Sequence, residues 1–152
     1  VAMNNTLVTK LNREIITRGK AQGKFIGGNL SVINSMLGSS YLPAWKNSIL
    51  FIEDIGEDVY RVDRMLVQLK NAGILNQLSG FVFGQCTRCS MGDEPSLTLM
   101  QVLQEHIAPL NIPAWYGSMI GHIRDKFTLP IGINVEINAS TGIIKMLEAA
   151  VR

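Results

Sequence analysis

Two short, unbroken apolar runs constrain the fold of this chain most strongly: SILFIE at residues 48–53 and GFVFGQC at residues 80–86. Such runs are typical of strands that are buried on both faces, as in parallel sheets. Between them, apolar residues recur at helical spacing, namely Val59, Val62, Leu66 and Leu69. The sequence therefore predicts a strand, a helix from about residue 57 to residue 72, and a second strand.

Further elements continue this alternation. The sequence predicts strands in LNREIITRG, in KFIGGN with a closing turn, and in IPAWYGS, and it predicts helices in LSVINSML and SLTLMQVLQEHIA. Ser96 is the expected N-cap of the latter helix. Alternating polar and apolar residues in INVEINAST, followed by GIIKML, predict a closing hairpin. We therefore expect an α/β fold, with a mixed sheet and flanking helices.

Length and composition narrow the class of protein. The chain has 152 residues, of which 47% are hydrophobic and 17% charged, and its net charge is +2. A chain of this size forms one domain with a substantial core. The basic residues are scattered, so nucleic acid is not an expected partner. No apolar run is long enough to span a bilayer, so no membrane partner is expected either.

The ends and the cysteines give three further expectations. Residues 1–10 are interpreted as a linker or the end of a missing N-terminal domain, and residues 11–152 as the domain. Residues 1–10 lack a signal-peptide pattern. Cys86 and Cys89 are expected to be reduced thiols in a cytoplasmic protein. A zinc site would need two more ligands than this CxxC supplies, so no metal is expected.

The acids after SILFIE divide into two groups. Glu57 and Asp58 suit the positive end of the following helix, and Glu57 is spaced to pair with Arg61. Glu53 differs, because it ends the strand itself. In open α/β sheets ligands collect outside the carboxyl ends of strands. An acid in that position could orient a histidine.

The histidines and polar loops offer further candidates. His106 lies late in a predicted helix, where we expect a surface position, whereas His122 lies in a glycine-rich connection. A lone loop histidine remains open to a structural or a catalytic interpretation. Gly27–Asn29 is either an ordinary turn or a close approach to a ligand. Ser118 lies outside any GxSxG motif, so the residues alone indicate an acid and a base but no nucleophile.

Four segments, in this order, resemble the C-terminal domain of the LD-carboxypeptidases: GKFIGGNL, ILFIEDIGEDVYRVDRMLVQLKNAGIL, GFVFGQC and GHIRDKFTLPIG. This family of two-domain serine peptidases includes the murein tetrapeptide carboxypeptidases and the microcin-immunity peptidases. The resemblance covers roughly residues 11 to 148. It implies that Glu53 and His122 complete a catalytic triad, with Asp54 as the alternative acid if the motif alignment shifts by one residue.

The resemblance also implies a reaction and partners. The expected substrate is a peptidoglycan-derived tetrapeptide that loses its terminal D-alanine during wall recycling. The nucleophilic serine would come from an N-terminal domain that this chain lacks, so the chain alone is expected to be inactive. Asn29 and either Arg124 or Lys126 are expected to bind the substrate. No metal or organic cofactor is expected, and the protein is expected to form a homodimer. The alternatives are a microcin-immunity-type peptidase and a non-catalytic binding module.

Overall fold

A computed structural model describes residues 5–10, 12–92 and 96–150, and these residues contain one mixed sheet. Its strands are β1 (Thr6–Val8), β2 (Glu14–Thr17), β3 (Lys20–Asn29), β4 (Ser48–Ile55), β5 (Gly80–Thr87), β6 (Ala114–Tyr116), β7 (Asn134–Asn138) and β8 (Ile143–Met146). They lie in the order β1-β8-β7-β3-β4-β5-β6-β2. Pairing from β3 through β6 is parallel, and all other pairing is antiparallel.

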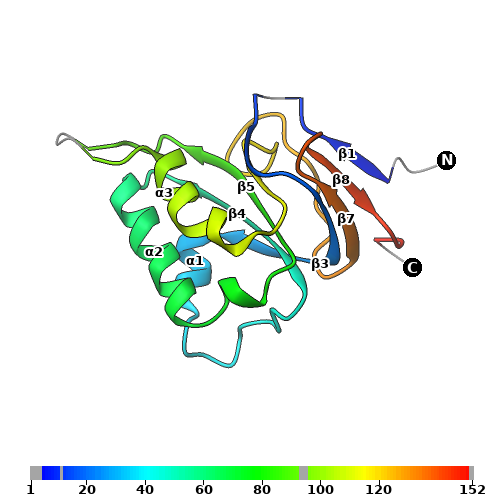
Figure 1. The fold of residues 1–152 in the computed structure, drawn as a ribbon, viewed down its shortest axis with the longest axis horizontal. Coiled ribbons are helices and arrows are strands. Elements are labelled where there is room, and N and C mark those ends of the chain that lie inside the picture. Colours follow the sequence, from blue (N-terminus) through cyan, green and yellow to red (C-terminus); the bar gives the residue numbers. More distant parts are fainter. Residues whose placement is uncertain (1–4, 11, 93–95, 151–152) are drawn as a thin grey trace.

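Three helices connect the parallel strands. They are α1 (Leu30–Ser35), α2 (Val59–Asn71) and α3 (Leu99–Ile107), and the short 3-10 helices η1 (Leu75–Gln77) and η2 (Ala108–Leu110) follow α2 and α3. Figure 1 shows the three α-helices together on one side of the central strands β4 and β5, with β7 and β8 on the opposite side. The predicted mixed sheet with flanking helices is therefore confirmed.

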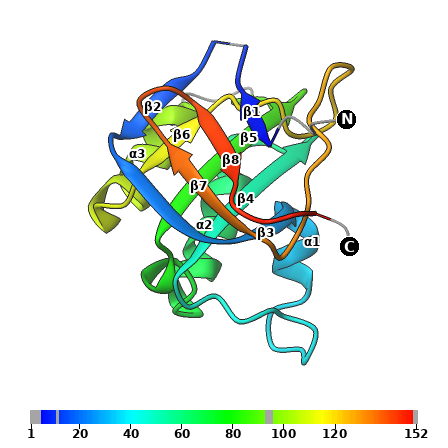
Figure 2. The same cartoon turned by 90° about the vertical axis from the view of Figure 1, so that its right-hand side faces the viewer.

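The apolar run of β4 is explained by burial on both faces of the sheet. Leu50 and Ile52 pack in a cluster with the helices, while Ile49 and Phe51 pack in a second cluster. This second cluster includes Val135 of β7 and residues of β8. Figure 2, which looks onto β7 and β8, shows these strands lying across the central ones. The antiparallel part of the sheet thus forms the second wall of the core.

The N-terminal segment contributes to the sheet. Although residues 1–10 were expected to be a linker or the end of another domain, Thr6–Val8 forms β1 and pairs with β8. Residues 1–4 of this expected linker lie outside the described part of the chain. KFIGGN also differs from expectation, because β3 leads directly into α1 without a closing turn. Its last residue, Asn29, accepts a hydrogen bond from the backbone of Val32 and so caps α1.

Helix boundaries and one buried histidine also correct the sequence interpretation. Thr98, not Ser96, caps α3, because Thr98 forms a reciprocal capping box with Gln101. His106 is buried rather than on the surface, with its Nε2 2.5 Å from Asp63 Oδ1 of α2. This contact joins α2 to α3 and lies between residues that are far apart in the sequence.

Candidate active site

The two acids near the carboxyl end of β4, Glu53 and Asp54, point to opposite sides of the sheet. Successive side chains of a strand alternate in direction, so Glu53 shares a face with Phe51, and Asp54 shares the other face with Ile52. Both acids are buried, with 8% of Glu53 and 1% of Asp54 exposed. Their positions therefore exclude a common role.

Asp54 stabilises the start of α1. Its carboxylate accepts hydrogen bonds from Asn29 Nδ2 at 3.0 Å and from the backbone nitrogens of Ser31 at 2.9 Å and Ile55 at 2.8 Å. These bonds satisfy a carboxylate that would otherwise be costly to bury. The alternative assignment of Asp54 as the histidine's partner is therefore wrong. Asn29, expected to bind substrate, has its side chain engaged in the same cap.

Glu53 meets His122, as the sequence suggested. Glu53 Oε2 lies 2.8 Å from His122 Nδ1, and the two residues are 69 positions apart in the chain. A carboxylate can only accept, so Nδ1 carries the proton and donates it to this bond. In the neutral imidazole, Nε2 then carries the lone pair. The imidazole side chain is 51% exposed, whereas the Glu53 side chain is only 10% exposed. The arrangement places a basic nitrogen at the surface with a buried acid behind it.

The loop of His122 lies directly against β5. A register irregularity places Gly84 and Gln85 of β5 opposite Glu53, since Ile52 pairs with Phe83 and Asp54 with Cys86. Bulges of this kind redirect side chains beside functional sites. The Gln85 backbone nitrogen donates to Ile120 O at 2.8 Å, which holds the loop two residues before His122.

Gly121 provides the space that the pair requires. Its φ of +130° is a conformation that residues with side chains rarely adopt, and an added Cβ would lie 3.2 Å from Glu53 Oε2. A glycine is therefore needed beside the carboxylate for steric and conformational reasons.

A cavity of about 280 Å³ opens in front of the pair. Its walls include Phe51, Ile120, Phe127, Leu129 and Ile131, together with Glu53, Gly121, His122 and Lys126. Lys126 lines this cavity, but Arg124, the preferred cation from the sequence, does not. The cavity thus combines an acid, a base and one cation with apolar walls.

Ser118 is near in sequence to His122 but is unsuited to act as the nucleophile. It is fully buried, and its hydroxyl lies 3.2 Å from the hydroxyl of Thr9. Within residues 5–10, 12–92 and 96–150, no hydroxyl group forms a hydrogen bond with His122 Nε2. The same residues contain no cluster of three or more potential metal ligands. None of their helices has the length and apolar character needed to cross a membrane.

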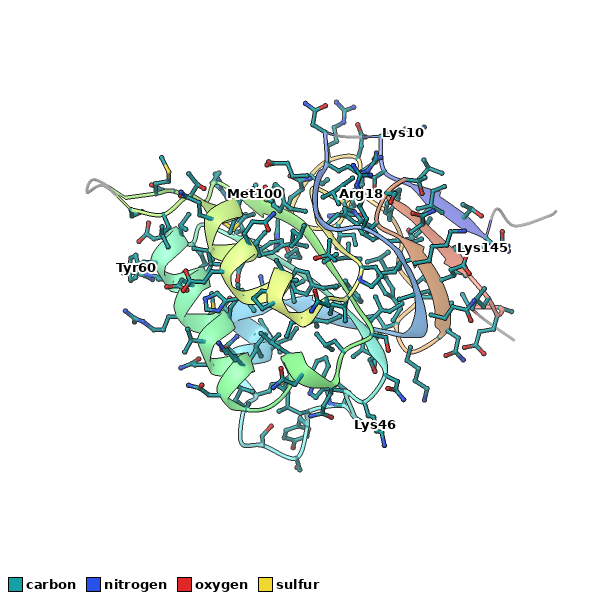
Figure 3. All side chains as sticks on the ribbon, in the orientation of Figure 1. Lys10, Arg18, Lys46, Tyr60, Met100 and Lys145 are labelled. Carbon is teal, nitrogen blue, oxygen red and sulfur yellow. A yellow bond between two sulfur atoms is a disulfide. The ribbon has the colours of Figure 1, made fainter. Side chains whose placement is uncertain are left out.

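The charged residues of α2 lie away from this cavity. Arg61 is 3.8 Å from Glu57, as their spacing predicted. Arg64 lies over the ring of Tyr60. Figure 3 shows Tyr60 projecting outward from α2. A hydrogen bond from the Arg61 guanidinium to the Tyr60 hydroxyl raises the pKa of Arg61. Glu57 and Asp58 precede the helix, which begins at Val59, so they flank its start rather than occupy its first turn.

Cys86 and Cys89 form a disulfide, which corrects the expectation of two reduced thiols. The spacing alone did not indicate the turn that brings them together, with Arg88 at φ +54°.

Sequence reasoning missed the contribution of Gln85 and Thr87. Gln85 Nε2 donates to Ser118 O at 3.2 Å, and the Thr87 hydroxyl donates to His122 O at 3.3 Å. The signal that identified Glu53 was also present here, because both residues lie at the carboxyl end of a buried strand.

Comparisons with known proteins identify the family and the fold. Residues 22–137 match the LD-carboxypeptidase C-terminal domain. The "Probable murein peptide carboxypeptidase" of Bacillus subtilis is 40% identical over 123 residues, which cover 80% of this chain and 39% of that protein. The crystal structure of a muramoyltetrapeptide carboxypeptidase from Oxalobacter formigenes has a TM-score of 0.79 at 30% identity, with 95% of this chain and 50% of that chain covered.

A second type of relative is the self-immunity protein MccF of Escherichia coli, 28% identical over 131 residues, which are 86% of this chain and 38% of that protein. Its structure in complex with glutamyl sulfamoyl guanosine has a TM-score of 0.83 at 27% identity, with 93% of this chain and 42% of that chain covered. The chain spans less than half the length of the curated relatives that it matches. The family match and the shared fold show that this chain belongs to the LD-carboxypeptidase family, as its C-terminal domain.

Proposed function

We propose that this chain supplies the acid and the base of a Ser–Glu–His peptidase site. The observation that carries the proposal is the 2.8 Å contact between Glu53 Oε2 and His122 Nδ1, with the imidazole half-exposed beside a cavity. In such a site an acid orients the histidine and stabilises its charged form. The burial of Glu53 and the exposure of His122 suit these two roles.

The proton transfers follow from this orientation. His122 Nε2 accepts the proton of the attacking serine hydroxyl while Nδ1 stays hydrogen-bonded to Glu53. The resulting imidazolium is stabilised by the adjacent carboxylate and then donates the Nε2 proton to the leaving amine. The substrate carboxylate needs a cation, and Lys126 is the better candidate than Arg124 because Lys126 lines the cavity.

The serine is proposed to come from a second domain. The full burial of Ser118 supports this proposal, because it removes the serine nearest to His122 in the sequence from consideration. The share of each relative that the chain covers leaves room for such a domain in those proteins. The isolated 152-residue chain is expected to release no D-alanine from a murein tetrapeptide. Turnover by the pure chain, sensitive to His122→Ala, would contradict the proposal.

The proposed reaction is removal of the terminal D-alanine from a murein tetrapeptide. The 40% identity to the Bacillus subtilis protein supports this substrate. A second candidate is a microcin-immunity-type peptidase, favoured by the higher TM-score to MccF, 0.83 against 0.79. Assaying murein tetrapeptide and an aminoacyl sulfamoyl nucleoside with the domain joined to its serine-bearing partner separates the two. The homodimer expected from the resemblance remains a prediction that analytical ultracentrifugation can test.

The decisive test compares His122→Ala with His106→Ala. The first removes the proposed base, and the second removes a buried histidine that contacts Asp63 on the helix side of the sheet. Loss of activity in the first variant, with a folded protein by circular dichroism, supports the proposal. Equal activity of wild type and His122→Ala overturns it, whereas the absence of activity from both proteins favours the non-catalytic binding module.

A further inference from the structure

The segment of residues 85–90, called here the β5 turn, holds the loop that carries His122. Gln85 donates from its backbone to Ile120 O and from its side chain to Ser118 O, at 2.8 and 3.2 Å. Thr87 donates from its hydroxyl to the carbonyl of His122 itself, at 3.3 Å. The position of the imidazole therefore depends on the conformation of the β5 turn.

The same β5 turn holds the segment that follows Glu53. The backbone nitrogen of Gly56 donates to Thr87 O at 2.9 Å, and that of Val59 donates to Ser90 O at 2.8 Å. In return, the nitrogen of Ser90 donates to Glu57 O at 3.2 Å. These bonds begin three residues after Glu53. One short segment thus contacts both chain regions that bring the acid and the base together.

The Cys86–Cys89 disulfide closes the β5 turn. Cys86 lies between Gln85 and Thr87, the two residues that hold the His122 loop, and its Cα is 5.4 Å from that of Cys89. Arg88, inside the closed turn, has a φ of +54°, a left-handed conformation that costs energy for a residue other than glycine. Without the covalent closure, the turn loses one of the constraints on this conformation. Both cysteines are partly exposed, so a small reductant can reach them.

We propose that Cys86–Cys89 is a thiol–disulfide exchange site that controls the geometry of the Glu53–His122 pair. The oxidised form holds the β5 turn in the conformation that positions the imidazole, and the reduced form releases the turn and lowers activity. The effect on the imidazole stands independently of the enzymatic role, whereas the effect on activity rests on the proposed function.

The reductant is a dithiol. One of its thiolates attacks one cysteine sulfur, which forms a mixed disulfide and releases the other cysteine as a thiolate. The second thiolate of the reductant then attacks the mixed disulfide and releases the remaining cysteine. Two electrons pass to the protein, the cysteine thiolates are in protonation equilibrium with solvent, and the reductant becomes a cyclic disulfide.

Nuclear magnetic resonance of the 152-residue chain tests the proposal, because the sequence contains only two histidines. The imidazole signals are assigned with His122→Ala and recorded in oxidised and in dithiothreitol-reduced protein, with the thiols counted by alkylation and mass spectrometry. We expect the His122 signals to shift or broaden on reduction and to return on reoxidation. The His106 signals, from the contact between α2 and α3, should stay unchanged and provide the internal control.

Two variants separate the turn from other effects of the reductant. Cys86→Ser/Cys89→Ser should give the reduced-form His122 signals and no response to dithiothreitol. Thr87→Val, which removes the hydroxyl bond to His122 O, should shift the same signals without reduction. In the enzyme that includes the serine-bearing domain, D-alanine release should fall about tenfold on reduction, as expected for a misplaced catalytic group.

The outcomes that overturn the proposal are specific. It fails if complete reduction leaves the His122 signals unchanged, if the double variant still responds to dithiothreitol, or if the cysteines remain thiols in an excess of oxidised glutathione. If His122→Ala keeps full peptidase activity, the proposed function fails instead, while a response of the His122 signals to reduction still supports the exchange site.

Discussion

Glu53→Gln and Asp54→Asn form a matched pair of substitutions at adjacent buried acids. Each removes one negative charge and keeps the shape of the side chain. Glu53 lies 2.8 Å from the imidazole of His122, whereas Asp54 accepts hydrogen bonds from Asn29, Ser31 and Ile55 on the other face of the sheet. We therefore expect Glu53→Gln to lower mainly the rate and Asp54→Asn to lower mainly the stability.

The expected loss of rate for Glu53→Gln follows from the geometry. Two unit charges 2.8 Å apart attract each other by about 6 kcal/mol at an effective dielectric constant of about 20. Because the imidazole is 51% exposed, water screens this attraction, and we expect loss of the Glu53 charge to remove about half of the energy. This corresponds to a rate that is lower by roughly 100-fold. Misorientation of the imidazole by the glutamine amide adds to this loss, up to about 10,000-fold in total.

Asp54→Asn should instead keep kcat within about threefold and lower the free energy of unfolding by about 1–3 kcal/mol. The amide NH2 of the new side chain would face N–H groups that donate hydrogen bonds to the Asp54 carboxylate, in a site that is 1% exposed. The assays are D-alanine release by the enzyme that includes the serine-bearing domain, and urea unfolding of this chain. Full activity of Glu53→Gln, or a rate loss of about 100-fold in Asp54→Asn, would refute the assignment of the acid.

Three further predictions concern other parts of the structure. Gly121→Ala should lower kcat about tenfold, because the added Cβ would lie 3.2 Å from Glu53 Oε2. Gly38 also has a positive φ but has open space around it, so Gly38→Ala should destabilise the fold without changing kcat in the same kinetic assay. Burial raises the pKa of Tyr116 above its usual value of 10.0, so its contribution to stability is complete below about pH 10 and is lost as the pH rises through the folded-state pKa. Urea unfolding at several alkaline pH values should show this loss, and Tyr116→Phe should remove it. Cys86→Ser/Cys89→Ser should lower the free energy of unfolding by about 2 kcal/mol or less, because the disulfide closes a short loop with a sequence separation of 3. A larger loss in the same unfolding assay would indicate that the turn stabilises more than its own segment.

The sequence was sufficient where local pattern and burial agree. The run in β4 predicted a strand buried on both faces, and the helical spacing of Val62, Leu66 and Leu69 predicted the buried face of α2. Glu53 could be singled out because it lies near the carboxyl end of a buried strand. In each case the signal lies within one element, so periodicity alone is enough to reveal it.

Long-range contacts were not predictable in the same way. The contact between His106 and Asp63 joins two helices over 43 positions, and no local pattern marks it. The disulfide depends on a turn at Arg88 with positive φ, which the residues of CTRC do not require. The pairing of Glu53 with His122 was suggested by family resemblance, and composition alone could not have selected His122 over His106.

The separate roles of Glu53 and Asp54 follow from the register of β4. Side chains alternate along a strand, so a shift by one residue would turn Asp54 toward His122 and Glu53 toward α1. Such a shift would also move Phe51 and Ile52 into each other's clusters, at the cost of both cores. The packing of these apolar residues therefore fixes which acid meets the histidine. The apolar run preceding the acids thus determines the geometry of the site as well as the stability of the sheet.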